Sequence, residues 1–150
     1  MGERGSGHLT ERDILLVEDD PADVGLISRA LRLAGRPVRL HHVRDGGECL
    51  AFLRREGRWA DAPRPDLVLL DLNMPLMDGR EALAEIRHDP SIAGLPVVVL
   101  TTSEHNRDVG ACYALGANGF VVKPMDLDEF TELMRSIADH WLGTVPPDAR

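Results

Sequence analysis

Residues 66–79 read Asp-Leu-Val-Leu-Leu-Asp-Leu-Asn-Met-Pro-Leu-Met-Asp-Gly. The four consecutive aliphatic residues at 67–70 are too few for a helix and lie between Pro65 and Pro75, so they predict a strand buried on both faces, as in a parallel sheet. Asp71 then stands at the carboxyl end of this strand, which is the edge where open α/β sheets bind ligands. A strand-end aspartate by itself often only caps a turn, so a chemical role for Asp71 depends on other residues at the same edge.

The length and composition of the chain predict one domain with loose ends. A chain of 150 residues buries about two-thirds of its unfolded surface without help from metals or disulfides. Residues 1–12 are rich in glycine and charge and predict a flexible leader, whereas 143–150 contain two prolines and predict a tail or arm. We therefore expect the folded domain to span residues 13–142.

The charge balance and the cysteines disfavour several classes of function. The chain has 17 Lys and Arg residues against 25 Asp and Glu residues, a formal net charge of −8, which disfavours nucleic acid or an acidic membrane as the main partner. Cys49 and Cys112 lack the spacing of a zinc site and are expected to be buried thiols. No apolar run approaches the roughly 20 residues of a membrane span, so we expect a cytoplasmic protein.

Five short segments predict strands, and each is followed by apolar residues at helical spacing. The predicted strands are 13–17, 38–43, 67–70, 96–100 and 119–122, and the predicted helices are 21–34, one that opens at Asp45, one through 82–86, 104–115 and 126–142. Parallel strands need crossover connections, so this alternation predicts a doubly wound α/β domain.

Capping signals support the first two helices. Asp20 and Pro21 suit the N-cap and first helical positions, and Gly35 suits the end of the same helix. Asp45 with Glu48 resembles a capping pair at the start of the second helix. Both helices follow a predicted strand directly, as strand-to-helix units require.

Polar residues follow four of the predicted strands. Glu18 and Asp19 close the first, Asp71 the third, Thr101 the fourth and Lys123 the fifth. Because parallel strands point the same way, these side chains should gather at one edge, where crowded carboxylates favour a divalent cation with oxygen ligands, above all Mg²⁺. A hydroxyl and an ammonium group opposite the metal would complete a site for the three oxygens of a phosphoryl group.

This arrangement assigns a chemical role to each side chain. Asp71 would be the nucleophile that accepts the phosphoryl group and forms an aspartyl phosphate. The metal, Thr101 and Lys123 would each neutralise or hydrogen-bond one phosphoryl oxygen as charge shifts. No general base is required, because a carboxylate is already ionised.

In this order and at these intervals, the motifs resemble the receiver domain of two-component response regulators. They are Glu18-Asp19-Asp20, Asp71 with Met74-Pro75 and Asp78-Gly79, Thr101-Thr102 and Lys123-Pro124, and the resemblance covers roughly residues 13–142. It implies a flavodoxin-like (CheY-like) fold with five parallel strands in the order 2-1-3-4-5. It also implies that the phosphohistidine of a histidine kinase phosphorylates Asp71, so that the chain is a signalling phosphoacceptor that catalyses only its own phosphorylation and dephosphorylation.

The resemblance implies a metal site and an unusual peptide bond. Asp19, Asp71 and the main-chain carbonyl of Asn73 would bind Mg²⁺ directly, and Glu18 would act mainly through water. The Lys123–Pro124 peptide bond is expected to be cis, a form that is common only before proline.

The resemblance also implies a conformational switch. Thr101 and Lys123 would take the switch roles, and Phe120 would swing into the space that Thr101 vacates. An ordinary core position for Phe120 fits the sequence equally well. Side chains at Asn73 and Ser103 would tune how fast water removes the phosphate, and because neither is a base we expect a moderately long-lived phosphoprotein.

A narrower resemblance points to the single-domain regulators that are paired with bacterial phytochromes. The stretches that carry it are Val17–Asp23, Val43–Gly46, Phe52–Arg55, Asp78–Glu81 and His140–Leu142. It implies that a phytochrome-type histidine kinase is the phosphoryl donor.

The last predicted helix has a wider apolar surface than one sheet face requires. Trp141 and Leu142 lie beyond the point where a sheet could cover them, so we expect a homodimer through this helix and the tail. The alternative is that Trp141 folds back onto its own domain. No output domain follows, so the signal should leave through a protein–protein surface formed by the fourth helix, fifth strand and fifth helix.

Three other classes of protein share part of this pattern: phosphohydrolases, flavodoxins and degenerate receivers. A phosphohydrolase of the dehalogenase type would also use Asp71, but it needs a second acid two residues later, where this chain has Asn73. A flavodoxin would need a phosphate-binding loop of Ser, Thr and Gly after the first strand, where three acids stand instead. A degenerate receiver that only binds partners is disfavoured because all five site residues are present.

Overall fold

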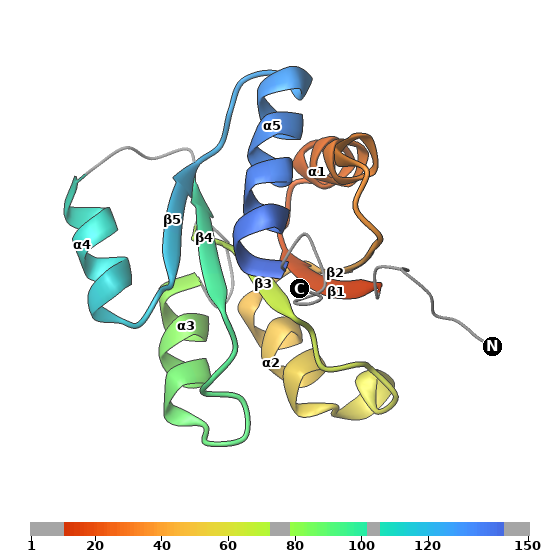
Figure 1. Cartoon of the computed structure of the whole chain (residues 1–150). Coiled ribbons are helices and arrows are strands. Elements are labelled where there is room, and N and C mark those ends of the chain that lie inside the picture. Colours follow the sequence, from red (N-terminus) through yellow and green to blue (C-terminus); the bar gives the residue numbers. More distant parts are fainter. Residues whose placement is uncertain (1–10, 73–78, 102–105, 143–150) are drawn as a thin grey trace, which may run out of the picture.

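A sheet of five parallel strands forms the centre of the computed structural model, which describes residues 11–72, 79–101 and 106–142 (Figure 1). The strands are β1 (Arg12–Val17), β2 (Val38–Val43), β3 (Leu67–Asp71), β4 (Val97–Thr101) and β5 (Gly119–Val122). Their order across the sheet is β2-β1-β3-β4-β5, and every neighbouring pair is parallel. The doubly wound, flavodoxin-like fold that the motifs imply is therefore confirmed.

Helices cover both faces of this sheet (Figure 1). They are α1 (Pro21–Ala34), α2 (Gly46–Arg54), η2 (Gly57–Trp59), α3 (Gly79–His88), α4 (Asn106–Ala114), α5 (Leu127–Ile137) and η3 (Ala138–Leu142). Side chains from α1 and α5 pack in one core on one face, whereas α2, α3 and α4 contribute to a second core on the other. None of the described helices is long and apolar enough to cross a membrane.

The period-two alternation of the strands divides the apolar side chains between the two cores. In β1, Ile14 and Leu16 face α1 and α5, whereas Leu15 and Val17 face α2 and α3. All four are completely buried, as the continuous aliphatic run predicted. Since β1, β3 and β4 are covered on both faces, the polar residues of these three strands lie at their ends.

The predicted caps of α1 and α2 are confirmed. The Asp20 side chain accepts a hydrogen bond of 2.9 Å from the Ala22 N–H, and α1 ends at Gly35, which has φ of +78°. Asp45 accepts from the Glu48 N–H at 2.9 Å, and Glu48 in turn accepts from the Arg44 N–H at 2.8 Å. These bonds satisfy N–H groups that the first helical turn leaves without partners.

Trp141 and Leu142 are covered by their own domain, so the expectation that no part of the sheet reaches them is wrong. Leu142 is only 5% exposed, and Trp141 packs partly buried against the core beneath α1 and α5. A Cβ atom at Gly119 in β5 would lie 3.5 Å from the Trp141 ring. The reason is that the chain continues from α5 into η3 and keeps both side chains turned towards the sheet.

Two other sequence expectations can be compared with the structure. Cys49 and Cys112 are both buried free thiols, as expected. The leader and the tail lie almost entirely outside the described residues, which begin at Glu11 and end at Leu142.

Gly79 allows α3 to begin directly against the end of β3. Its N–H donates a hydrogen bond of 3.2 Å to the Leu72 carbonyl. A Cβ atom at this position would lie 2.5 Å from the backbone oxygen of Asp71 and 2.8 Å from the Leu72 Cα, which is closer than real Cβ contacts. Glycine is therefore needed here so that α3 can approach the residue that carries the candidate nucleophile.

The Gly79→Ala variant should lower the free energy of unfolding by about 1–3 kcal/mol, because α3 must shift to relieve the overlap. Urea denaturation followed by circular dichroism measures this change. The matched control is Gly25→Ala, at an exposed position inside α1 with no atom within 4 Å of the new Cβ, which should raise stability by about 0.5–1 kcal/mol. Wild-type stability in Gly79→Ala would contradict the close approach.

Candidate functional site

Three carboxylates converge where β1 and β3 end. These two strands are neighbours, with Val17 opposite Leu70. Glu18 and Asp19 directly follow β1, and Asp71 is the last residue of β3, so the three side chains lie at the same level of the sheet. One oxygen from each of the three side chains lies within 4.8 Å of the others. Glu18 and Asp71 are buried and Asp19 is exposed, so the cluster has a dry inner side and a side open to solvent.

Lys123 brings a positive charge to these carboxylates from the end of the edge strand β5. It follows β5, and its backbone N–H donates to the Thr101 carbonyl at 2.7 Å. Its Nζ lies 2.6 Å from Glu18 Oε1, 2.8 Å from Asp23 Oδ2 and 3.8 Å from Asp71 Oδ1. The lysine is therefore hydrogen-bonded to Glu18 and Asp23 and forms a longer ion pair with Asp71.

The sequence analysis missed two residues that contact this cluster. Asp23, in the first turn of α1, is a hydrogen-bond acceptor for Lys123, although its sequence position indicates only an acid near a helix start. His42 of β2 lies with Nε2 2.7 Å from the Glu18 carbonyl oxygen. No local pattern marks these residues, because their partners are 100 and 24 positions away in the chain.

The electrostatics of the cluster follow from its burial. Burial raises the pKa of Glu18 to about 7, and the charge of Asp71 acts in the same direction, although the hydrogen bond from Lys123 opposes it. Burial alone would lower the pKa of Lys123, but hydrogen bonds to Asp23 and Glu18 and the charge of Asp71 raise it to about 12. Lys123 therefore stays charged at neutral pH, while Glu18 titrates there in the absence of metal.

Thr101 and Phe120 lie on the strands next to the acidic cluster. Thr101 ends β4, which is paired with β3, and its side chain is completely buried. Phe120, in β5, is partly buried and packs against the core on the α2 and α3 side of the sheet. Asn73 and Ser103, the residues expected to tune the phosphate lifetime, lie outside the described residues, as do residues 74–78.

The Lys123–Pro124 peptide bond is trans, so the expected cis bond is wrong. The part of the chain that the structure describes contains no cis peptide bond. The trans form is the intrinsically favoured isomer even before proline. Lys123 reaches the acidic cluster from this backbone without the rarer isomer.

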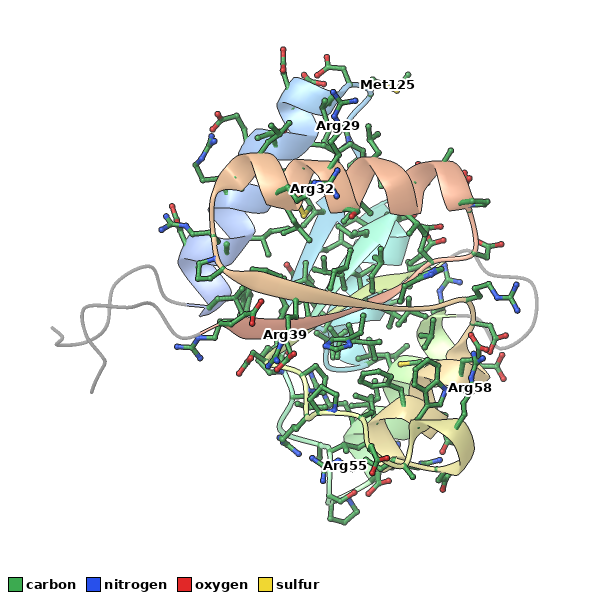
Figure 2. All side chains as sticks on the ribbon, turned by 90° about the vertical axis from the view of Figure 1, so that its right-hand side faces the viewer. Arg29, Arg32, Arg39, Arg55, Arg58 and Met125 are labelled. Carbon is green, nitrogen blue, oxygen red and sulfur yellow. The ribbon has the colours of Figure 1, made fainter. Side chains whose placement is uncertain are left out.

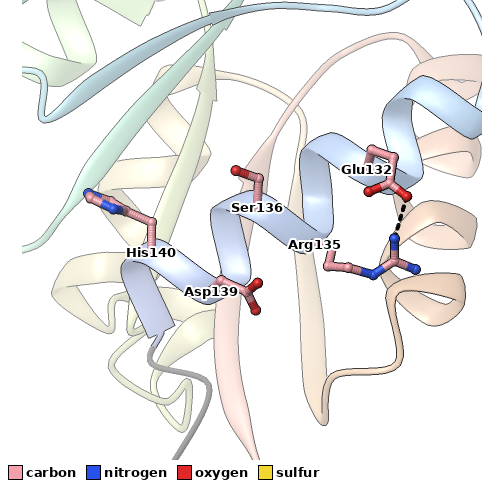
Figure 3. A pocket seen from close by; sticks show the side chains of 5 residues that line it. All are labelled: Glu132, Arg135, Ser136, Asp139 and His140. Carbon is pink, nitrogen blue, oxygen red and sulfur yellow. Dashed lines mark hydrogen bonds and ion pairs between the residues drawn. The ribbon is translucent and has the colours of Figure 1, made fainter.

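A shallow hollow lies on the outer face of α5, away from the strand-end cluster (Figure 3). It encloses about 480 Å³ and is lined by Glu132, Arg135, Ser136, Asp139 and His140. Figure 3 shows these side chains spread along one side of α5 and η3, with Arg135 paired to Glu132 at 2.6 Å. This hollow is polar, and none of the predicted phosphoryl-site residues lines it.

Comparison with known proteins assigns the family. The model of the response regulator receiver domain matches residues 14–135, which include all five residues of the strand-end site. The chain belongs to the response regulator receiver domain family. Receiver domains are signalling proteins that work with histidine kinases, so the resemblance stated from the motifs is confirmed at the level of the family.

Individual relatives place this receiver domain near phytochrome response regulators. It is 44% identical over 132 residues to the response regulator Rcp1 of Synechocystis, an alignment that covers 88% of this chain and 90% of Rcp1. The crystal structure of the phosphorylated cyanobacterial phytochrome response regulator RcpA superposes with a TM-score of 0.84 at 45% identity, covering 91% and 99% of the two chains. The Mn²⁺-bound form of Rcp1 superposes with a TM-score of 0.80 at 42% identity, covering 90% and 99%.

Removal of the Glu18 charge should change how the stability of the metal-free protein depends on pH. With a folded-state pKa near 7, raised from 4.5, the folded protein binds more protons than the unfolded chain between these values, so stability should fall as pH rises through that window. Glu18→Gln should remove this component, and the variant should gain stability relative to wild type as pH rises.

Urea denaturation in EDTA at several pH values, from the ordinary glutamate pKa of 4.5 to above the raised value of about 7, measures this difference. Glu56→Gln, at an exposed position outside the site, controls for the loss of one negative charge. A constant difference between wild type and Glu18→Gln across the series would show that Glu18 does not titrate there.

Proposed function

We propose that this receiver domain accepts a phosphoryl group on Asp71 from the phosphohistidine of a histidine kinase, with Mg²⁺ as the supporting cation. The observation that carries the proposal is the meeting of Asp71 with Glu18 and Asp19 on one side and with the Lys123 ammonium on the other. Elements far apart in the sequence bring these four side chains together. A purely structural ion pair would need only one acid and the lysine, so the additional acids favour a functional site. The family match supports the same chemistry.

The acidic cluster fits a hard divalent cation. Its donors are carboxylate oxygens within 4.8 Å of one another, and the exposed side at Asp19 leaves room for the waters that Mg²⁺ retains. Asp19, Asp71 and the Asn73 carbonyl would hold the ion directly and Glu18 through water. When bound, the cation neutralises negative charge on the phosphoryl oxygens. The Mn²⁺-bound form of the relative Rcp1 supports a divalent ion here, and the choice of Mg²⁺ is part of the proposal.

The transfer step needs no external base. A carboxylate oxygen of Asp71 forms a bond to phosphorus, the phosphorus–nitrogen bond to the kinase histidine breaks, and its electron pair returns to the imidazole ring. The product is an acyl phosphate on Asp71. Lys123, which already lies 3.8 Å from Asp71, would contact one phosphoryl oxygen, and the Thr101 hydroxyl would bond another.

The same residues would catalyse only the protein's own phosphorylation and its hydrolysis. Movement of Thr101 towards the phosphate would favour the second conformation, with Phe120 filling the space that Thr101 leaves. Phe120 is only partly buried, which leaves it freedom for such a movement. Asn73 and Ser103 would set the rate at which water attacks the phosphate.

We further propose a phytochrome-type kinase as the phosphoryl donor in the cytoplasm. The support comes from the relatives: RcpA is a cyanobacterial phytochrome response regulator, and RPA3017 of R. palustris, 33% identical with a TM-score of 0.84, belongs to red light signalling. Both structures superpose over about nine-tenths of this chain, so the similarity extends well beyond the residues of the site.

A homodimer through the last helix is also part of the proposal. Because Leu142 is buried and Trp141 packs partly on its own domain, the contact should come from the outward face of α5 instead. The polar hollow beside Ser136 offers a recessed surface on that face (Figure 3). The strand β5 is at the edge of the sheet, with α4 on one face and α5 on the other, so one surface along this edge would carry both the dimer and the output signal.

Intact-mass spectrometry after incubation with a small phosphodonor and Mg²⁺ tests the phosphoryl site. Wild type should gain one phosphate and Asp71→Asn none, because the amide lacks the anionic oxygen that attacks phosphorus. Asp19→Ala should lose the Mg²⁺ dependence and most of the rate.

The matched control for these variants is Asp20→Asn, a change in the same acidic run at the N-cap of α1. Asparagine caps a helix as well as aspartate does, so this variant should gain one phosphate at the wild-type rate. Phosphorylation of Asp71→Asn, or a normal rate in Asp19→Ala, would overturn the assignment of the site.

Sedimentation velocity tests the proposed dimer. Wild type should sediment as a dimer and Ser136→Arg as a monomer, because a charged, bulky side chain would occupy the hollow on the outer face of α5. Ala111→Arg, at an exposed position of α4, is the control and should remain a dimer. Loss of the dimer only in Ala111→Arg would move the contact to α4.

A further inference from the structure

The segment of residues 24–44 is strongly basic in an otherwise acidic chain. It contains five arginines and no aspartate or glutamate, whereas the whole chain has a net charge of −8. The segment forms most of α1 and all of the strand β2. Its arginines are Arg29, Arg32, Arg36, Arg39 and Arg44. Figure 2 shows Arg29 and Arg32 on α1, above β2, on the side of the molecule where the sheet ends.

The strand β2 has an open edge on this basic side. It is the last strand of the sheet and pairs only with β1. The Pro37 carbonyl accepts a hydrogen bond from Arg12 of β1, and the Val43 carbonyl accepts one from Glu18, the residue after β1, so by alternation the odd-numbered residues of β2 face β1. The backbone N–H and C=O groups of Val38, Leu40 and His42 therefore point outward.

A small pocket lies between this open edge and α1. It encloses about 220 Å³ and is lined by Ser28, Leu31, Arg32, Arg36, Val38 and Leu40. Its apolar lining comes from one leucine of α1 and from the two β2 residues whose backbone groups face outward. Its polar lining comes mainly from two guanidinium groups. An added strand would therefore place alternate side chains into this pocket.

The arginines of this face retain hydrogen-bonding capacity. Arg36 pairs with Asp139 through one terminal nitrogen, but its Nε is buried and has no hydrogen-bond partner among the described residues. Arg32 contacts the Ser28 hydroxyl at a long 3.4 Å and forms no ion pair with a described residue. Arg39, by contrast, is already paired with Asp13. Arg32 and Arg36 thus both line the pocket, and although the buried Arg36 Nε is out of reach of a docked segment, Arg32 has no ion pair with a described residue.

We propose that the open edge of β2 and the pocket beneath α1 form a docking site for an extended acidic segment of another protein. The segment would add a strand to the sheet beside β2, with one apolar side chain in the pocket and flanking carboxylates on Arg32 and Arg36. Charge complementarity selects an acidic partner, and the unpaired strand edge selects an extended one. This site lies on the edge strand of the sheet, separate from Asp71, so it does not depend on the proposed phosphoryl transfer.

Two alternative occupants fit less well. A nucleic acid would use the basic side chains but has no backbone that pairs with a strand edge and no need of an apolar pocket. A second copy of this chain would bring its own basic edge strand to the same place, where the arginines would repel one another.

The test uses a synthetic peptide, Thr-Glu-Thr-Val-Thr-Glu-Thr, in which valine and both glutamates share one face. Titration of the full-length protein should show saturable binding by fluorescence anisotropy of the labelled peptide. The peptide with glutamine for glutamate should bind about tenfold more weakly, and the one with proline for valine should not bind, because proline blocks the strand.

Protein variants locate the site. Arg32→Glu should weaken binding of the acidic peptide by about tenfold. Arg55→Glu makes the same change of charge at an exposed position after α2 and should leave binding unchanged. Equal weakening in the two variants would show a general charge effect and overturn the proposal, as would binding of a single-stranded oligonucleotide that displaces the peptide.

Amide hydrogen exchange by NMR distinguishes an added strand from a contact between side chains alone. The peptide should slow exchange of the outward-facing Leu40 amide by about tenfold or more and leave the Arg39 and His41 amides, already directed at β1, nearly unchanged. Absence of this protection would overturn the proposal. Full protection of the Leu40 amide in the free protein would also overturn it, because the strand edge would then already be occupied.

Discussion

The burial of like charges beside one ammonium group is the constraint on which the rest of this structure depends. Glu18 and Asp71 are almost completely buried, and each would be costly to ionise there without a compensating positive charge. Lys123 supplies part of that compensation and is itself held in the charged form by Glu18 and Asp23. The remaining negative charge favours the binding of a cation, and the proposed phosphoryl group would need that cation to offset its own negative charge.

The fold brings this cluster together at the ends of covered strands. Both β3 and β4 are covered on both faces, so each is aliphatic up to its last residue, Asp71 or Thr101. Asp71 follows four buried residues of β3, and Gly79 lets α3 begin directly against its backbone. The packed core thus holds together carboxylates that repel one another.

The two sides of the molecule differ in charge as well as in structure. The strand ends carry the acids of the proposed phosphoryl site, whereas the sheet edge at β2 lies beside Arg32 of α1 and Arg36, which line a small pocket. One surface is suited to a cation and a phosphoryl group, and the other is suited to carboxylates. A signalling domain with both can bind a partner at the edge while its phosphorylation state changes elsewhere.

The sequence by itself determined the strands, the caps at Asp20 and Asp45 and the strand-end positions of Glu18, Asp19, Asp71, Thr101 and Lys123. Aliphatic runs, capping side chains and strand-end polar residues are local signals, and the order of the motifs identified the family. Only the tertiary structure decided the contact of Lys123 with Asp23, the trans bond before Pro124 and the burial of Leu142. The Lys123–Asp23 contact and the burial of Leu142 depend on which distant segments meet in space, and no local pattern encodes that.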